Sequence, residues 1–252
     1  MRVKVLSSSV EGAPHQFAAS YVIDDFLCLD AGSLGFSDIE RQQQVRHVLL
    51  THSHLDHVAS LPIFIDNVYE CGPDCPTIYA GEQVIETLRT NFFNELVWPD
   101  LDRLSSEDSP FVDFEILKHR RPLAIEGITV TPVELDHVVP TFGFVVDDGV
   151  TAVGFVSDTG PTEEIWEVLR AKPNLKAIFL EAAFPNSMSA VAERSKHLTP
   201  ALFEQEYRKL GREIPVLAIH IKPAFYDEVV EELRALESPT VEISEPNRTY
   251  DF

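Results

Sequence analysis

The segment Thr51–His57 gathers three histidines and one aspartate within six residues, in the order His-Ser-His-Leu-Asp-His. It follows an apolar run that predicts a buried β-strand, and it opens a helical pattern. Because side chains alternate along a strand, His52 and His54 leave its end on the same side, and Asp56 and His57 lie where the chain turns into the helix. Imidazole and carboxylate ligands suit a borderline-soft divalent metal such as zinc. We therefore expect a metal site, because a solvated loop has no reason to favour three histidines.

Strand-like and helix-like segments alternate along the rest of the chain, and they must position this cluster. Short apolar runs predict strands at Val3–Leu6, Tyr21–Leu29 with a turn at Asp24-Asp25, Val45–Thr51, Val112–Leu117, Leu123–Leu135, Thr141–Val156 with a turn at 147–149, Leu175–Leu180, Val216–Ile219 and Val241–Ile243. Helical spacing predicts helices in the first half of Leu55–Tyr69, in Glu82–Phe93, Pro161–Lys172 and Pro200–Leu210, and from Phe225 to Leu236. We expect an α/β protein of two sheets covered by helices, with residues 1–252 in a single domain.

Charge and composition exclude several classes of function. The formal net charge is −21, and nucleic-acid binding depends on Lys and Arg neutralising phosphates, so we expect no nucleic-acid partner. The sequence has no run of 18 apolar residues and no apolar core of a signal peptide, which predicts a cytoplasmic protein without a membrane span. Its cysteines are Cys28, Cys71 and Cys75, and we expect the last two to be free thiols, because no second pair completes a metal site.

The His-x-His-x-Asp-His motif after a buried strand resembles the metallo-β-lactamase fold of dinuclear metallohydrolases, an αββα sandwich. Asp30-Ala31-Gly32 matches the family's early Asp-Ala-Gly turn, and Ser157 departs from its usual glycine before the bridging aspartate. The resemblance implies two divalent metal ions. Their seven ligands would be His52, His54 and His137 for the first ion, Asp56, His57 and His220 for the second, and Asp158 bridging both. Zn²⁺ is the expected metal, with Mn²⁺ or Fe²⁺ as alternatives.

Further segments resemble one branch of this superfamily, the class II 3′,5′-cyclic-nucleotide phosphodiesterases. They are His52–Leu61, the Phe-Asn-x-x-x-Trp-Pro stretch at 93–99, Asp158–Pro161, Leu180–Asn186 and Lys196–Thr199. The resemblance implies hydrolysis of cAMP, with cGMP as an alternative, to a 5′-nucleotide. A hydroxide bridging the metals would attack phosphorus and donate a hydrogen bond to Asp56. His197, oriented by Glu181, would protonate the leaving oxygen, and the alternative for His197 is to cap the helix that begins near Pro200.

The base of the nucleotide needs stacking and polar contacts, and Phe93, Asn94 and Trp98 are the candidates. Core packing explains Phe93 equally well, and Trp98-Pro99 is a candidate surface of a homodimer. Three other functions stay open. A 3′-tRNA processing endonuclease shares the metal motif, and a lactone or thioester hydrolase would use the same centre. The third is a metal-binding protein that has lost catalysis, against which the full ligand set argues, because a degenerate site usually loses ligands. The net charge of −21 favours a small substrate with a single negative charge over tRNA.

Overall fold

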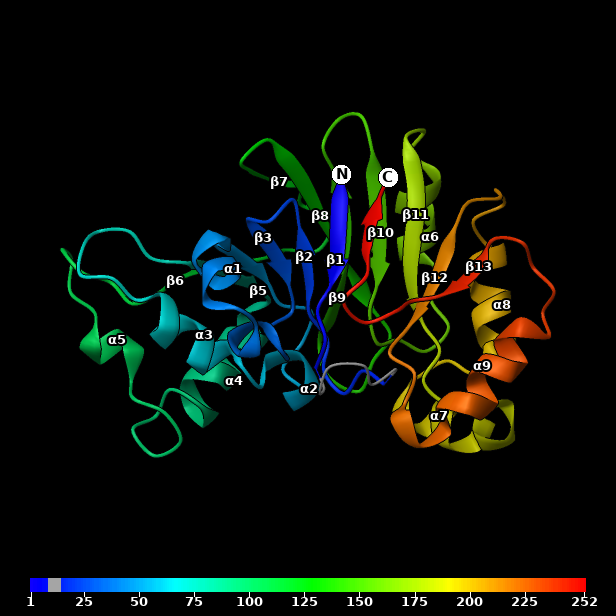
Figure 1. Cartoon of the computed structure of the whole chain (residues 1–252), viewed down its shortest axis with the longest axis horizontal. Helices are drawn as coiled ribbons and strands as arrows, with labels where there is room; N and C mark the ends of the chain where they lie inside the picture. The colour runs from blue at the N-terminus through cyan, green and yellow to red at the C-terminus, as the bar shows by residue number, and fades with distance from the viewer. Residues whose placement is uncertain (9–14) are drawn as a thin grey trace.

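A computed structural model of the protein describes residues 1–8 and 15–252. Within these residues the strands form two sheets of seven strands each, which pack face to face (Figure 1). Helices cover the outer face of each sheet. The predicted αββα sandwich is therefore confirmed.

The first sheet joins an antiparallel part to a parallel part. Its order is β14-β1-β2-β3-β4-β5-β6, with bounds Thr249–Asp251, Arg2–Val5, Tyr21–Ile23, Leu27–Leu29, His47–Leu49, Thr77–Ala80 and Asp113–Ile116. Neighbours are antiparallel from β14 to β3 and parallel from β3 to β6. Asp24 and Asp25 form the predicted turn between β2 and β3, and both have positive φ angles, 46° and 67°. Short polar side chains of this kind are among those that tolerate the left-handed conformation.

The second sheet is built in the same way. Its order is β13-β12-β11-β10-β9-β8-β7, with bounds Val241–Ile243, Val216–Ile219, Leu175–Glu181, Ala152–Val156, Thr141–Asp147, Ile128–Leu135 and Leu123–Ile125. Neighbours are antiparallel from β7 to β10 and parallel from β10 to β13. The segment predicted as one strand from Leu123 to Leu135 is two strands. They are separated by Glu126 and Gly127, whose φ angles are 45° and 90°.

The helices mostly connect parallel strands. They are α1 Ile39–Gln44, α2 Leu55–Val58, α3 Leu61–Val68, α4 Glu82–Asn91, α5 Leu101–Leu104, α6 Glu164–Arg170, α7 Ser189–Ser195, α8 Pro200–Arg208 and α9 Tyr226–Arg234, with 3₁₀ turns at Leu34–Phe36, Asn186–Met188 and Pro223–Phe225. The helix predicted for the first half of Leu55–Tyr69 is only the four residues of α2, and the longer helix α3 occupies the second half, so the prediction that Pro62 limits the helix is wrong. This proline lies in the first turn of α3, where a missing N–H breaks no helical hydrogen bond. None of the helices in the described part is long and apolar enough to cross a membrane.

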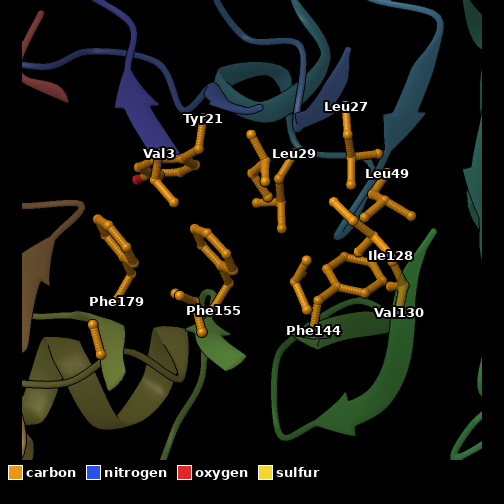
Figure 2. Close-up of a cluster of buried hydrophobic side chains, with 14 of the residues drawn as sticks. Val3, Tyr21, Leu27, Leu29, Leu49, Ile128, Val130, Phe144, Phe155 and Phe179 are labelled. Atoms are coloured by element: carbon orange, nitrogen blue, oxygen red, sulfur yellow. The ribbon is translucent and has the colours of Figure 1, made fainter. Parts of the chain in front are cut away.

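The main core lies between the sheets (Figure 2). The first sheet contributes Val3, Tyr21, Leu27, Leu29 and Leu49, and the second contributes Ile128, Val130, Phe144, Phe155 and Phe179. The rings of Phe155 and Phe179 stack with their centroids 4.9 Å apart. Alternation along β4 sends Leu49 into this core and Val48 toward α3 and α4, so β4 is packed on both faces and its carboxyl end is fixed.

Candidate metal centre

The predicted ligands come together from four places in the sequence, and Asp30 and Glu181 join them from two more, each at or just beyond the end of a strand. The segment 51–57 follows β4 and enters α2. His137 follows β8, Asp158 follows β10 and His220 follows β12. Asp30 and Glu181 lie at the ends of β3 and β11. Antiparallel β8 and β9 bring His137 to the edge of the second sheet where β10 to β12 end, which is why residues so distant in sequence can meet.

Two groups of metal-ligating atoms result. In the first, the ligand atoms of His52, His54, His137 and Asp158 lie within 4.8 Å of one another, and in the second those of Asp56, His57 and His220 do. Oδ2 of Asp158 lies 3.7 Å from Nε2 of His52, 3.5 Å from Nε2 of His57 and 3.5 Å from Nε2 of His220. A single carboxylate oxygen is therefore shared by both groups, as expected of a residue that bridges two ions.

One hydrogen-bond network orients His52 and His57. Oδ2 of Asp30 lies 2.7 Å from Nδ1 of His57 and accepts from the Thr51 hydroxyl at 2.9 Å. Because that hydroxyl donates to Asp30, its oxygen accepts from Nδ1 of His52 at 2.9 Å. Both imidazoles thus carry a proton on Nδ1 and turn Nε2 toward the cluster. This tautomer follows from the acceptor-only carboxylate of Asp30, whose role the sequence prediction missed.

His137 is held in the same way by the main chain. Its Nδ1 lies 3.0 Å from the carbonyl oxygen of Lys196, which can only accept, and its Nε2 lies 3.5 Å from Nδ1 of His54. Lys196 has a left-handed backbone with φ of 53°. A non-glycine residue in this conformation costs energy and often marks a functional site. Here it presents its carbonyl to His137 immediately before His197.

The donor atoms fit a divalent metal. Nε2 of His52 and Nε2 of His57 are buried and have no hydrogen-bond partner in the described part of the chain. A buried polar atom without a partner is costly, and coordination to a metal would satisfy both nitrogens. The backbone of the turn after Asp30 packs directly against the backbone of Asp56. Only glycine fits at position 32, because a Cβ there would lie 2.0 Å from the carbonyl oxygen of Asp56.

Electrostatics separates the roles of the buried groups. Burial and the neighbouring His57 hold the pKa of His52 well below its usual value, so this imidazole is neutral. Burial also lowers the pKa of His57, but Asp158 and Asp30 outweigh it and raise that pKa well above its usual value. Burial raises the pKa of Asp158, yet His220 and His57 outweigh it and leave the pKa well below its usual range. Asp158 is therefore an anion, and a metal at His57 would displace a proton.

His197 and Glu181 form a buried pair beside the cluster. Nδ1 of His197 lies 2.8 Å from Oε1 of Glu181, and Glu181 also accepts from the backbone N–H groups of Thr159 and Leu198. Burial lowers the pKa of His197, but Glu181 outweighs it and raises that pKa. Thr199 caps α8 with its side chain, so the capping role considered for His197 belongs to Thr199. His197 also forms a third potential metal-binding group with Asp158 and His220, a second role that sequence reasoning did not consider.

The three residues predicted to contact the base lie outside the two ligand groups, and each one packs against or hydrogen-bonds its own neighbours. Phe93 is buried in the core beside α4, which agrees with the packing alternative. Oδ1 of Asn94 accepts from the backbone of Leu96 and Val97, and its Nδ2 donates to the carbonyl of Thr90, so its side chain closes its own loop. Trp98 packs against the same core. Their contact with a substrate stays a prediction.

Known proteins with similar sequences and structures agree with this geometry. A probable 3′,5′-cyclic-nucleotide phosphodiesterase of Yersinia pestis is 27% identical over 212 residues, which cover 73% of this chain and 59% of that protein. The chain thus spans about three fifths of that relative. Unliganded yeast PDE1 superposes with a TM-score of 0.81 at 18% identity and 98% coverage of both chains. The short form of human tRNase Z superposes with a TM-score of 0.71 at 14% identity, covering 100% of this chain and 99% of that one.

The two structural likenesses establish the fold and leave the reaction open, since one fold carries many activities. A family model for the β-lactamase superfamily domain matches residues 34–221, from the turn after Asp30 to the residue after His220. The matched region therefore contains all the predicted ligands. This chain belongs to the β-lactamase superfamily domain family, and the relatives it resembles include 3′,5′-cyclic-nucleotide phosphodiesterases.

Proposed function

We propose that this protein is a metal-dependent phosphodiesterase that hydrolyses 3′,5′-cyclic nucleotides, cAMP above all, to 5′-nucleotides. The observation that carries the proposal is the position of Asp158, whose Oδ2 lies within 3.5 to 3.7 Å of histidines from both ligand groups. Paired divalent ions are a common solution for phosphodiester hydrolysis. The 27% identity with the Yersinia pestis relative supports the cyclic-nucleotide substrate.

The proposed ligands divide between two ions. His52, His54 and His137 would hold one, Asp56, His57 and His220 the other, and Asp158 would contact both. Zn²⁺ suits this set of imidazoles and carboxylates, with Mn²⁺ or Fe²⁺ as alternatives. When bound, such ions supply Lewis acidity at the phosphoryl oxygens and lower the pKa of water, so that a nucleophile exists at neutral pH.

The remaining chemistry belongs to the side chains. Asp56 is partly exposed beside the cluster, and its carboxylate would accept a hydrogen bond from the attacking water and orient it. As the bond from phosphorus to the 3′ oxygen breaks, that oxygen gains charge and needs a proton. Nδ1 of His197 is committed to Glu181, so the proton would come from Nε2. Because Glu181 is buried and accepts two backbone N–H groups, it would keep the imidazole in one orientation.

Charge favours a small substrate over a nucleic acid. A cyclic nucleotide carries a single negative charge, which the proposed ions would offset, whereas a long polyanion would meet the field of a chain with net charge −21. The absence of a nucleic-acid partner, the cytoplasmic location, the single domain and a homodimer stay predictions.

A substrate panel tests this proposal. Purified protein of measured metal content would be assayed with cAMP, cGMP, bis(p-nitrophenyl) phosphate, precursor tRNA, a lactone and a thioester. We expect about two metal ions per chain, release of 5′-AMP from cAMP, and intact precursor tRNA. The variant His54→Ala should lose metal and activity together. Efficient cleavage of precursor tRNA with cyclic nucleotides untouched would contradict the proposal, and so would a fully folded, metal-loaded protein that attacks only the lactone or the thioester.

A further inference from the structure

A cavity of about 760 Å³ lies beside the candidate metal centre. Three segments line it: residues 81–83 at the start of α4, residues 116–119 at and after the end of β6, and residues 134, 135 and 137–142 from the end of β8 to the start of β9. His137 is one of the lining residues, so the cavity adjoins the first ligand group. Its volume lies within the range of about 300–1,000 Å³ that is usual for sites of small molecules.

The walls of this cavity expose aliphatic surface from both sheets. Ile116, at the end of β6 in the first sheet, is 50% exposed, and Val138, which follows β8 in the second sheet, is 52% exposed. Phe142, which is buried, and Pro140 complete the apolar part of the lining. Aliphatic side chains that stay half exposed in a concave site gain free energy when a flat apolar group covers them.

The charges in the cavity disfavour a polyanion. Glu82 and Glu134 contribute two carboxylates, against the single ammonium group of Lys118. His119 is engaged, since its Nδ1 accepts from the backbone N–H of Glu134 and its Nε2 lies 2.8 Å from Glu164. An uncharged ring that carries amino groups is compatible with these walls, because the carboxylates and the Gln83 amide offer acceptors to its edge.

We propose that this cavity binds the base of the cyclic nucleotide, between the exposed faces of Ile116 and Val138. The inference rests on the proposed function and extends it to the part of the substrate that does not react. The ring centroids of His137 and His197 are 5.0 Å apart, so the wall of the cavity stands next to the proposed proton donor. The ribose that carries the leaving oxygen also carries the base. A ribose whose oxygen meets His197 can therefore extend its base along the His137 wall.

Matched valine substitutions test the cavity. Val138→Asp and Ile116→Asp place a charge on its walls, whereas Val150→Asp makes the same change at a valine that is 79% exposed in the turn between β9 and β10. For each variant we would measure kcat and KM with cAMP and with methyl p-nitrophenyl phosphate, which has no base, together with metal content and Tm. Val138→Asn serves as a milder second variant should the aspartate lower Tm.

We expect the cavity variants to raise KM for cAMP about tenfold or more, the scale on which a stacked base contributes to binding. Their kcat/KM for methyl p-nitrophenyl phosphate should stay within about twofold of wild type. The kcat/KM of Val150→Asp should stay within the same range for both substrates. Equal values of KM for cAMP in the cavity variants and in Val150→Asp would overturn the inference.

A binding measurement separates this inference from the proposed function. If the metal-loaded wild type hydrolyses no cyclic nucleotide, the proposed reaction fails, and calorimetry with 5′-AMP then decides the cavity. Weaker binding of 5′-AMP to Val138→Asp than to Val150→Asp would support a base site. No binding to wild type, or equal affinities among the variants, would overturn it. Tight binding of precursor tRNA that only the cavity variants lose would assign the cavity to RNA and overturn it as well.

Discussion

Asp30→Asn tests whether the network behind the candidate ligands fixes their orientation. The Asp30 carboxylate accepts from the backbone N–H of Thr51 at 2.8 Å and from its hydroxyl at 2.9 Å, and lies 2.7 Å from Nδ1 of His57. Asparagine keeps the shape but replaces one acceptor oxygen by an NH₂ group. That group can accept from neither Thr51 nor His57. The change therefore disturbs the orientation of His57, and through Thr51 that of His52, without removing any proposed ligand.

The expected loss can be worked from these contacts. A hydrogen bond to a charged group contributes about 1.5–3 kcal/mol, and each ~1.4 kcal/mol is a factor of ten in an equilibrium constant. We therefore expect metal affinity to fall about 10- to 100-fold, the usual effect of removing the carboxylate behind a histidine ligand. Burial raises the pKa of Asp30 although His57 and Thr51 oppose the shift, so the charge is also costly to bury. The free energy of unfolding of the metal-free protein should change less than metal affinity does.

The assay is a competition titration with a chromogenic chelator, on wild type, Asp30→Asn and a matched control. Asp25→Asn is that control, because Asp25 also has a positive φ angle and pairs with Arg2 at the surface. We expect Asp30→Asn to bind two ions more weakly and Asp25→Asn to match wild type. Wild-type affinity in Asp30→Asn would show that the contact with His57 does not govern coordination.

Three further outcomes follow from the geometry of the centre. His197→Ala should keep both ions and slow cAMP hydrolysis about 10²–10⁴-fold. It should slow hydrolysis of bis(p-nitrophenyl) phosphate far less, because nitrophenolate leaves without a proton. Equal losses on the two substrates, or lost metal, would point instead to the alternative role of His197 as a ligand. Nζ of Lys222 lies 3.4 Å from Oδ2 of Asp56 and 3.4 Å from Nε2 of His220. Lys222→Met should therefore raise KM for the anionic cAMP about two- to fivefold while Lys222→Arg retains affinity, and an unchanged KM would contradict a role in binding the phosphate. Removal of metal by a chelator should lower Tm by about 5–10 °C in differential scanning fluorimetry, because ions at ~100 times their Kd stabilise by ~2.7 kcal/mol, and an unchanged Tm would show that the histidines hold no metal.

Local patterns predict most of the sandwich, and they fail where a strand depends on distant partners. The strands Val216–Ile219 and Val241–Ile243 have the predicted bounds, because apolar runs between turns carry their own signal. β5 and β14 were not predicted. They are four and three residues long, and β14 pairs with β1 from the other end of the chain. No local periodicity reports the pairing of β14 with β1.

Local patterns likewise predict only part of the candidate metal centre. The motif from His52 to His57 can be recognised in the sequence, because all its ligands lie on one strand end and one helix. The meeting of His137, Asp158 and His220 with that motif depends on strand order, and only the family resemblance pointed to it. The contact between Asp30 and His57 depends on the left-handed backbone at Asp30, with φ of 59°. The walls of the proposed base site come from both sheets, so no window of sequence contains them.

The pairing of β14 with β1 has a mechanical consequence for the centre. β14 follows the second sheet in sequence, yet it joins the first sheet through Arg2–Asp251, Val3–Tyr250 and Lys4–Thr249. Each ligand group also draws on both sheets, since His54 meets His137 and His57 meets His220. Shear of one sheet over the other would change both groups at once, and β14 ties the end of the chain that forms the second sheet to β1 of the first sheet. We therefore expect the two halves to unfold in one cooperative transition.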